Sequence, residues 1–388
     1  MSDLAREPLF FPGDAIHQIR ADRVAAALRT HELDGLLLLK HDAVRYVTGF
    51  YAKGYRPFID FDYAALVRRD RDTVLGYTVG GEERRIALRS RVSDSFRLPG
   101  FNRWGAGLAE MLRRFGVTRG RLGFDILPHF IYQALRADFP NLELVDASAL
   151  WADLTAIKHP LEIPMIEQAL RIAEAGIAAA IEAIRPGVTE IEVSAAAEST
   201  MRAMRSEMNP FIPVVASGAN AAIWERVATH RPLAAGEMVI LDFGAVWNGY
   251  TGDFARTTIV GEPTAAQRAL YRAAYDSLTA AIAAVRPGVL CSEIDRIGRE
   301  VIAAAGFARY AQPWAMGHQL GFGLHGEPLL GPGVDVALQA GMVLNIEPSL
   351  YTCDDLTIGG VELEDTVLVT ETGSRRLTDF PYEPRLLD

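Results

Sequence analysis

The sequence predicts an α/β (α+β) protein with two domains, residues 1–155 and 156–388, and three observations support this prediction. First, 388 residues are more than one ordinary domain holds. Second, strand-like and helix-like segments alternate up to about residue 150, and a long alanine-rich helix is then expected over 163–184. Third, the second domain contains an internal repeat of a helix, a Pro-Gly stop and another helix.

The first domain begins with an amphipathic segment, 15–31, followed by the apolar run 35–39 that is typical of a buried strand. The same patterns predict strands at 63–67, 73–79, 122–124 and 142–145, and a helix at 106–115. Elements that alternate in this way predict an α/β layer. We find no cofactor fingerprint here, and Gly80-Gly81 is expected to form a turn.

The internal repeat joins residues 178–188 to 279–289, which share Arg-Pro-Gly-Val at matching positions. In each copy a helix stops at Pro-Gly, and a second helix begins at Glu190 or at Ser292. Strands are expected after each helix pair, near 211–215 and 342–347. Alanine-rich helices can resemble one another by chance, but the shared tetrapeptide favours two helix-helix-sheet halves around a pseudo-twofold axis.

Composition and charge exclude several classes of function. The net charge is −10 without a basic cluster, so no nucleic-acid partner is expected. The start, Met1 to Glu7, lacks the features of a signal peptide, and no apolar stretch reaches the ~20 residues needed to cross a membrane. Cys291 and Cys353 have no metal-type spacing and are expected to be reduced thiols. These features predict a cytoplasmic protein with no membrane partner.

A hairpin is expected in the middle of the second domain. The segments 238–244 and 250–260 are strand-like, and Asn248-Gly249 lies between them. Asn-Gly is the strongest short-range hairpin signal, because both of its residues accept a positive φ. With these two residues as the loop, Trp247 pairs with Tyr250.

Counting outward from that turn brings two aspartates together. Asp242 then faces Ala255, and Asp253 lies on the same face, diagonal to Asp242. Diagonal neighbours on a sheet are within ~7–8 Å of each other. A solvated hairpin face is the alternative, but both aspartates interrupt apolar strands, where unpaired acids are costly. We therefore favour a metal site.

Three further residues complete the candidate metal site. His318 lies among glycines, Glu347 follows an apolar strand, and Glu364 is expected inside the strand 360–367. Each of them alone is more often an ordinary polar residue. Together with the two aspartates they supply four carboxylates and one imidazole, which suit two divalent ions. This ligand set suits Mn²⁺, Co²⁺, Fe²⁺ or Zn²⁺ and does not choose among them, and Mn²⁺ is taken as the first expectation.

In this order and context, the five residues resemble the ligand signature of the pita-bread metallopeptidases, the family of aminopeptidase P, prolidase and creatinase. The resemblance covers 156–388 in detail, and the layout of the whole chain is similar, with a creatinase-like N-terminal domain. It implies a hydrolase with two metal ions that cleaves a C–N (amide) bond, of the Xaa-Pro dipeptidase or aminopeptidase P type. It also implies a homodimer.

The resemblance further implies a role for each residue. Asp242 would bind one metal, His318 and Glu347 the other, and Asp253 and Glu364 both. A hydroxide held by the metals would be the nucleophile, and Glu347 would move the proton.

A second histidine is also implied in catalysis and substrate binding. His325 matches the family histidine that hydrogen-bonds the substrate or the tetrahedral intermediate. From the sequence alone, a structural histidine is an equal alternative.

Three departures from the family concern the substrate. Glu225 stands where the peptidases carry a substrate-binding histidine, for which His230 is a possible substitute; Glu362 stands where they carry arginine; and His325 is followed by Gly-Glu-Pro. Neutral drift is one explanation. The other is a more negative pocket rim that favours a cationic or amidine substrate, as in small-molecule C–N hydrolases of the ectoine hydrolase or creatinase type. A catalytically silent binding module is the alternative from another class.

Overall fold

The computed structural model describes residues 13–51, 62–69 and 72–388. Its internal contacts divide the chain into an N-terminal unit, Met1–Leu154, and a C-terminal unit, Thr155–Asp388. The segment from Met1 to Glu7, expected not to be a signal peptide, lies outside the described residues. Among the residues that are described, no helix is both long enough and apolar enough to cross a membrane.

The N-terminal unit contains a six-stranded sheet in the order β4-β3-β2-β1-β5-β6. The strands are β1 (Gly35–Leu38), β2 (Tyr63–Arg68), β3 (Thr73–Tyr77), β4 (Asp94–Arg97), β5 (Gly120–Phe124) and β6 (Leu142–Asp146). Strand β2 runs antiparallel to β1 and β3, and the other neighbours are parallel. The expected α/β layer is therefore confirmed.

The helices of this unit are α1 (Asp14–Thr30), α2 (His41–Thr48), α3 (Glu83–Arg89), α4 (Trp104–Arg114) and α5 (His129–Asp138), and α6 (Ser148–Ala156) follows. Helices α1 and α4 match the predicted segments, whereas the short helices α2, α3, α5 and α6 were not predicted. A helix of two or three turns offers too few repeats of the 3.6-residue period to stand out in a sequence. The expected turn at Gly80-Gly81 is present, with Gly81 at a φ of 86°.

The C-terminal unit is built from helix pairs and sheets. Its helices are α7 (Ile163–Ala183), α8 (Glu190–Ala203), α9 (Ala219–Ala222), α10 (Ala265–Ala284), α11 (Cys291–Ala304) and α12 (Pro384–Leu387). One sheet is formed by β7 (Val214–Ser217), β8 (Met238–Trp247) and β9 (Tyr250–Ile259). A second has the order β11-β10-β12-β15-β16: β10 (Gly317–Gly321), β11 (Gly323–Leu329), β12 (Val343–Ile346), β15 (Asp365–Val369) and β16 (Ser374–Arg376). Strands β13 (Ser349–Tyr351) and β14 (Gly360–Glu362) form a pair.

The internal repeat is present as two equivalent helix pairs. Helices α7 and α10 end one residue before Ile184 and Val285, whose backbone angles are nearly the same. Gly187 and Gly288 follow at φ of 89° and 88°. Their amides donate to the carbonyls of Leu233 and Leu338 over 2.9 and 2.8 Å. Matching hydrogen bonds at matching positions confirm the two like halves.

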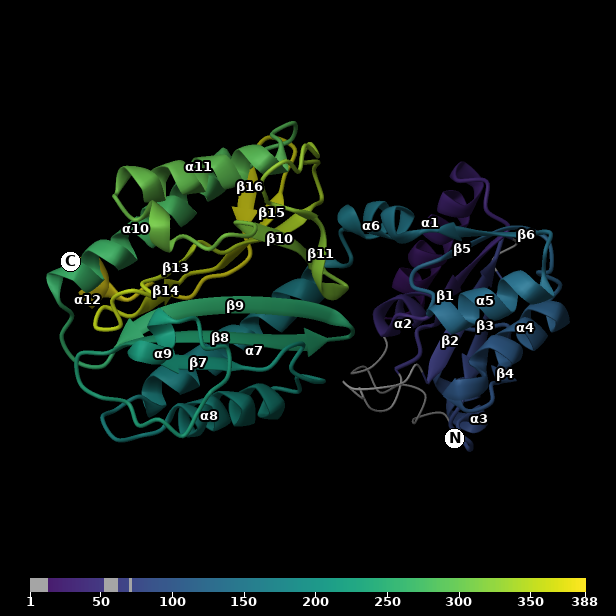
Figure 1. Ribbon diagram of the computed structural model, residues 1–388, viewed down its shortest axis with the longest axis horizontal. Coiled ribbons are helices and arrows are strands. Elements are labelled where there is room, and N and C mark those ends of the chain that lie inside the picture. Colours follow the sequence, from purple (N-terminus) through teal and green to yellow (C-terminus); the bar gives the residue numbers. More distant parts are fainter. Residues whose placement is uncertain (1–12, 52–61, 70–71) are drawn as a thin grey trace. The chain divides into compact units, whose positions relative to one another are not determined.

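Each helix pair lies against strands of its own half (Figure 1). Helices α7 and α8 pack on β7, β8 and β9, whereas α10 packs on β12, β13 and β14, and α11 packs against α10. Strand β9 also contacts β10, β11, β14 and β15, so it lies where the two halves meet. Any polar side chain that β9 directs toward the other half is therefore enclosed by both.

The β8–β9 hairpin has the predicted register. Trp247 pairs with Tyr250 and Asp242 with Ala255, across a turn in which Asn248 and Gly249 have φ of 51° and 84°. Asp253 pairs with Gly244, which places it diagonal to Asp242 as expected.

Candidate metal centre

Two carboxylates lie on the buried hairpin. Asp242 and Asp253 are 2% and 3% exposed, on strands whose other side chains are almost all buried. Gly244, opposite Asp253, packs so tightly against Pro210 and Phe211 that an added Cβ would lie 2.4 Å from the proline ring. The hairpin backbone at Gly244 is thus held close to residues 210 and 211.

The second half supplies the remaining candidates. His318 lies in β10 opposite Asn345 of β12, and Glu347 directly follows β12. Glu364 was expected inside a strand, and this was wrong: it lies in the break between β14 and β15. Asn345 Nδ2 donates to Glu364 Oε2 over 3.1 Å, and the Glu364 amide donates to the Ala255 carbonyl over 3.2 Å. The break turns this carboxylate toward β9.

The five predicted ligands gather in overlapping groups whose ligand atoms lie within 4.8 Å of one another. The groups are Asp242, Asp253 and Glu364; Asp253, His318 and His325; and Glu347, Glu362 and Glu364. Asp253 and Glu364 each belong to two groups. Residues separated by more than 100 positions in the chain thus form one cluster.

Several atoms of this cluster have no hydrogen-bond partner within the described part of the chain. They are Asp242 Oδ1, Asp253 Oδ1 and His318 Nε2, all buried. The nearest charge to His318 Nε2 is Asp253 Oδ2, at 3.4 Å. Buried polar atoms are nearly always satisfied, so unpaired oxygens and an imidazole nitrogen that converge on one place fit a bound cation.

The electrostatics of the cluster also favour a bound cation. Burial raises the pKa of Glu347 to about 7, and the carboxylates of Asp253 and Glu362 add to this rise. Burial and neighbouring acids likewise raise the pKa values of Asp242 and Glu364. Burial alone would lower the pKa of His318, but the acids beside it raise this pKa to about 9. Divalent cations would relieve this crowding of negative charge.

Sequence reasoning missed the arginine at this cluster. Arg226 Nη2 lies 3.0 Å from Asp242 Oδ2, and Arg226 Nη1 lies 3.2 Å from Glu362 Oε1. Glu362 was expected on a negative pocket rim, but it is 2% exposed and paired. Its charge is therefore offset. No local signal marks Arg226, because its partners lie 16 and 136 positions away.

Two family models match the chain. Metallopeptidase family M24 matches residues 164–371, and the creatinase/prolidase N-terminal domain matches residues 20–157. The chain is 34% identical over 367 residues to the Xaa-Pro dipeptidase of Pyrococcus horikoshii, covering 94% of this chain and 98% of that protein. The chain belongs to metallopeptidase family M24. The resemblance inferred from the five ligands is confirmed.

Further relatives of this M24 metallopeptidase agree. It is 31% identical over 359 residues to the uncharacterized peptidase YqhT of Bacillus subtilis, covering 90% of this chain and 95% of that protein. The solved prolidase structure from Pyrococcus furiosus superposes with a TM-score of 0.79 at 29% identity, covering 92% of this chain and 99% of that one. The chain is thus a hydrolase of the metallopeptidase type, from a family that uses divalent metal ions.

Three of the four predicted substrate residues of this M24 chain, the fourth being the buried Glu362, occupy different surroundings. His325, on β11, is exposed, and its ring centroid lies 4.4 Å from that of His318. Burial of part of the ring and the charge of His318 lower the pKa of His325. His230 is exposed and Glu225 is half-buried; neither is in the groups within 4.8 Å, among the residues described. Their binding roles stay predictions.

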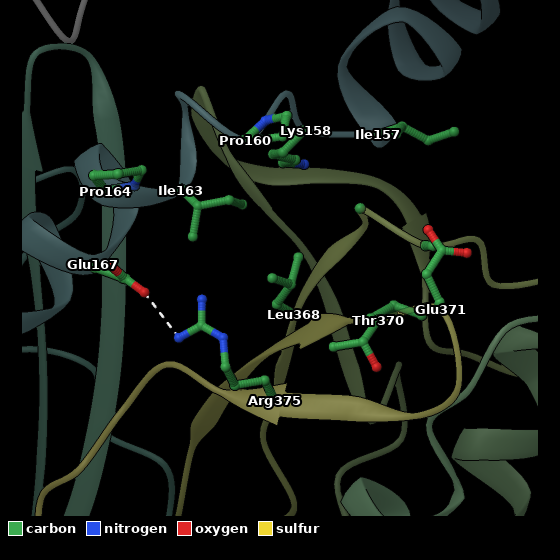
Figure 2. Close-up of a pocket in the computed structure, with 13 residues that line it drawn as sticks. Ile157, Lys158, Pro160, Ile163, Pro164, Glu167, Leu368, Thr370, Glu371 and Arg375 are labelled. Atoms are coloured by element: carbon green, nitrogen blue, oxygen red, sulfur yellow. Dashed lines mark hydrogen bonds and ion pairs between the residues drawn. The ribbon is translucent and has the colours of Figure 1, made fainter.

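A separate pocket of about 610 Å³ opens elsewhere on the C-terminal unit (Figure 2). Arg375 pairs with Glu167 across it at 2.9 Å, between apolar walls that include Ile163 and Leu368. The five predicted ligands are not part of its lining. The metal-type cluster, and not this pocket, is therefore the candidate active site.

Proposed function

We propose that this chain hydrolyses the Xaa-Pro bond of dipeptides with two divalent ions held by Asp242, Asp253, His318, Glu347 and Glu364. The convergence of these side chains, with buried ligand atoms left unpaired, carries the proposal. Asp253 and Glu364 would help to hold both ions, because each of them belongs to two groups. Relatives named Xaa-Pro dipeptidase support the substrate.

The bound ions would supply an activated water and a counter-charge for the developing oxyanion. The chain's own residues supply the rest. Glu347, beside His318 at 3.8 Å, moves the proton to the leaving nitrogen. His325, exposed next to His318, donates a hydrogen bond to the substrate or to the tetrahedral species.

The main alternative is a small-molecule C–N hydrolase of the ectoine hydrolase or creatinase type. It depends on Glu225 and Glu362 making the site more negative. Arg226 offsets Glu362 at 3.2 Å, and this pairing favours the dipeptide over a cationic or amidine compound. A silent binding module is disfavoured, because a buried acid cluster without a cation is destabilising.

Four further properties belong to the same proposal. Mn²⁺ is the working ion, the active form is a homodimer, and the two units are a creatinase-like domain and a catalytic domain. A cytoplasmic location is supported by Cys291 and Cys353, which are both free thiols. Elemental analysis and sedimentation of the purified protein test the ion and the dimer.

The deciding experiment is hydrolysis by Mn²⁺- and Co²⁺-loaded protein of Xaa-Pro dipeptides, a longer Xaa-Pro peptide, ectoine and creatine. Asp253→Ala is the blank. Dipeptide cleavage that disappears in this variant is the expected result. Turnover of ectoine or creatine alone would replace the proposal with the small-molecule alternative, and metal binding without any turnover would favour the binding module.

A further inference from the structure

The segment between α9 and β8 carries a cation to the edge of the acid cluster. The Arg226 side chain is 41% exposed, whereas its partners Asp242 and Glu362 are 2% and 3% exposed at their side chains. The guanidinium therefore lies between the buried acids and solvent, where an incoming substrate would meet it. A guanidinium has five N–H donors in a fork that matches a carboxylate.

An aromatic surface adjoins this cation. Trp224 stacks on Trp314 with ring centroids 4.0 Å apart, and Tyr351 lies 5.6 Å from Trp224. The two tryptophans are 38% and 36% exposed. The Arg226 guanidinium is 5.5 Å from the Trp224 ring. An exposed aromatic face beside a cation suits a ligand with both an apolar ring and an anionic group.

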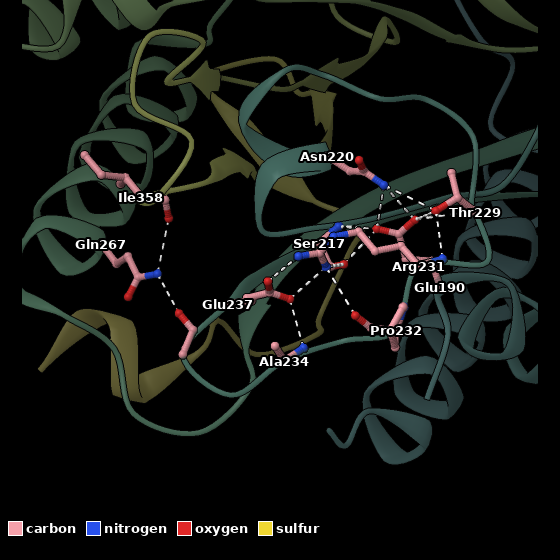
Figure 3. Close-up of polar contacts among 11 residues, drawn as sticks. Glu190, Ser217, Asn220, Thr229, Arg231, Pro232, Ala234, Glu237, Gln267 and Ile358 are labelled. Atoms are coloured by element: carbon pink, nitrogen blue, oxygen red, sulfur yellow. Dashed lines mark hydrogen bonds and ion pairs between the residues drawn. The ribbon is translucent and has the colours of Figure 1, made fainter. Parts of the chain in front are cut away.

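A buried carboxylate holds both ends of this segment (Figure 3). Glu190, at the first turn of α8, is 0% exposed. It accepts hydrogen bonds from Asn220 Nδ2 at 3.0 Å before the segment and from Thr229 Oγ1 at 2.5 Å after it. The amide and the hydroxyl of Ser217 also donate to it, over 2.8 and 2.7 Å. The position of Arg226 is thus set in advance.

Cations bound by the acids would change the charge partners of Arg226. A cation bound at Asp242 would replace the guanidinium as its counter-charge. Arg226 would keep Glu362 at Nη1 and have Nη2 available. Glu362 is then the acid of the cluster that no ion offsets, so a substrate carboxylate beside it needs a cation of its own.

We propose that Arg226 binds the free carboxylate of the substrate, while the Trp224–Trp314 stack contacts the ring of its C-terminal residue. This inference rests on the proposed dipeptide function and adds the residue that selects the substrate: Arg226, on the segment between α9 and β8. Glu190 is a positioning residue, because it acts through the segment that carries Arg226.

The test measures binding and needs no turnover. Calorimetric titration of the Mn²⁺-loaded protein with L-proline and with L-prolinamide compares ligands that differ at the carboxylate. Proline is expected to bind at least about 10-fold tighter to the wild type, the factor for one charge-assisted hydrogen bond. Arg226→Gln is expected to reduce this preference to about 2-fold or less, and Arg226→Lys to an intermediate value.

Arg296→Gln is the matched control, since Arg296 is also half-exposed and pairs with two acids, Glu293 and Glu300. It is expected to keep the wild-type preference. Metal content and thermal unfolding of each variant are checked first. If Arg226→Gln loses metal, Arg226→Lys takes its place in the comparison of the two ligands. The same preference in Arg226→Gln and wild type, or no proline binding to the wild type, would overturn the inference.

The two proposals fail separately. If proline binding depends on Arg226 but the protein does not cleave dipeptides, the proposed function is wrong and the carboxylate site stands. Equal cleavage of a dipeptide by wild type and Arg226→Gln would keep the proposed function and remove the role of Arg226.

Discussion

The two halves of the C-terminal unit share a backbone frame, and one pair of equivalent buried positions within it carries different side chains. Glu190 begins α8 and Cys291 begins α11, both 0% exposed. Their amides donate to equivalent carbonyls, those of Arg231 and Val336, over 3.1 and 2.9 Å. The same frame thus carries a carboxylate in the first half and a thiol in the second.

This difference shows that the two halves position their polar segments in different ways. Glu190 collects donors from Ser217, Asn220 and Thr229 and so holds the segment that carries Arg226. Cys291 lies in an apolar cluster with residues of α10 and of β12, the strand that leads to Glu347. The first half fixes a polar segment through a buried charge, whereas in the second half apolar packing holds the strand that leads to the predicted ligand Glu347.

The largest expected contrast concerns the reactivity of Cys291. Burial raises its pKa to about 11, so at pH 8 about one molecule in a thousand carries the thiolate at this position. Reactivity therefore increases only as the pH approaches 11. Iodoacetamide at pH 8, followed by peptide mapping, is expected to label Cys291 at least about 100-fold more slowly than exposed Cys353. Comparable rates in the folded protein would show that this position is open.

The next contrast is in the free energy of unfolding. Glu190→Ala leaves several buried donors without an acceptor and is expected to lower this free energy by about 3–5 kcal/mol. Cys291→Ala removes one sulfur atom from an apolar cluster and is expected to lower it by about 1 kcal/mol. Urea denaturation measures both, with Glu182→Ala, at an exposed acid of α7, as the control. Equal losses of unfolding free energy at Glu190 and Cys291 would contradict this difference between the halves.

A pair of glycines tests the shared frame itself. Gly187 and Gly288 have φ of 89° and 88°, and nothing lies within 4 Å of a Cβ added to either. Alanine at each position therefore meets backbone strain alone, of about 1–2 kcal/mol. Gly187→Ala and Gly288→Ala are expected to lower thermal stability equally. A clear inequality would mean that the two turns are not equivalent.

The smallest effect is expected at Thr229, whose hydroxyl donates to Glu190. Thr229→Val keeps the shape and loses about 1 kcal/mol of stability. Because it loosens the segment that carries Arg226, KM for a Xaa-Pro dipeptide is expected to rise about 3-fold at unchanged kcat. Thr357→Val, which removes an exposed hydroxyl bound to Asp355, is the control. A fall in kcat alone would assign Thr229 a different role.

Much of this arrangement could be predicted from the sequence because its signals are local. The Asn248-Gly249 turn determines the hairpin register, and the register places Asp242 diagonal to Asp253. The Arg-Pro-Gly-Val repeat predicts the two helix pairs for the same reason. Short helices such as α2 lack enough turns to show a period, and the break that contains Glu364 leaves no mark among strand-like residues.

The long-range pairs could not be predicted. Glu190 resembles an ordinary acid in the first turn of a helix, and its burial depends on partners 27 to 39 positions later. Arg226 lies in a polar segment, and its partner Glu362 follows 136 positions later. Without this pairing, Glu362 suggested a negative rim and a cationic substrate. The sequence shows the negative charge of Glu362, but only the fold shows that Arg226 pairs with it.

The central claim is that the acids of both halves hold two metal ions as one site. Calorimetric titration of Mn²⁺ into metal-free protein tests it most directly, in the wild type and in Asp253→Asn, which keeps the shape of the side chain. Asp253 belongs to two ligand groups. The account predicts two ions per chain and a loss of affinity of about 100-fold or more at both in the variant. Two ions bound by Asp253→Asn with wild-type affinity, or none bound by the wild type, would contradict it.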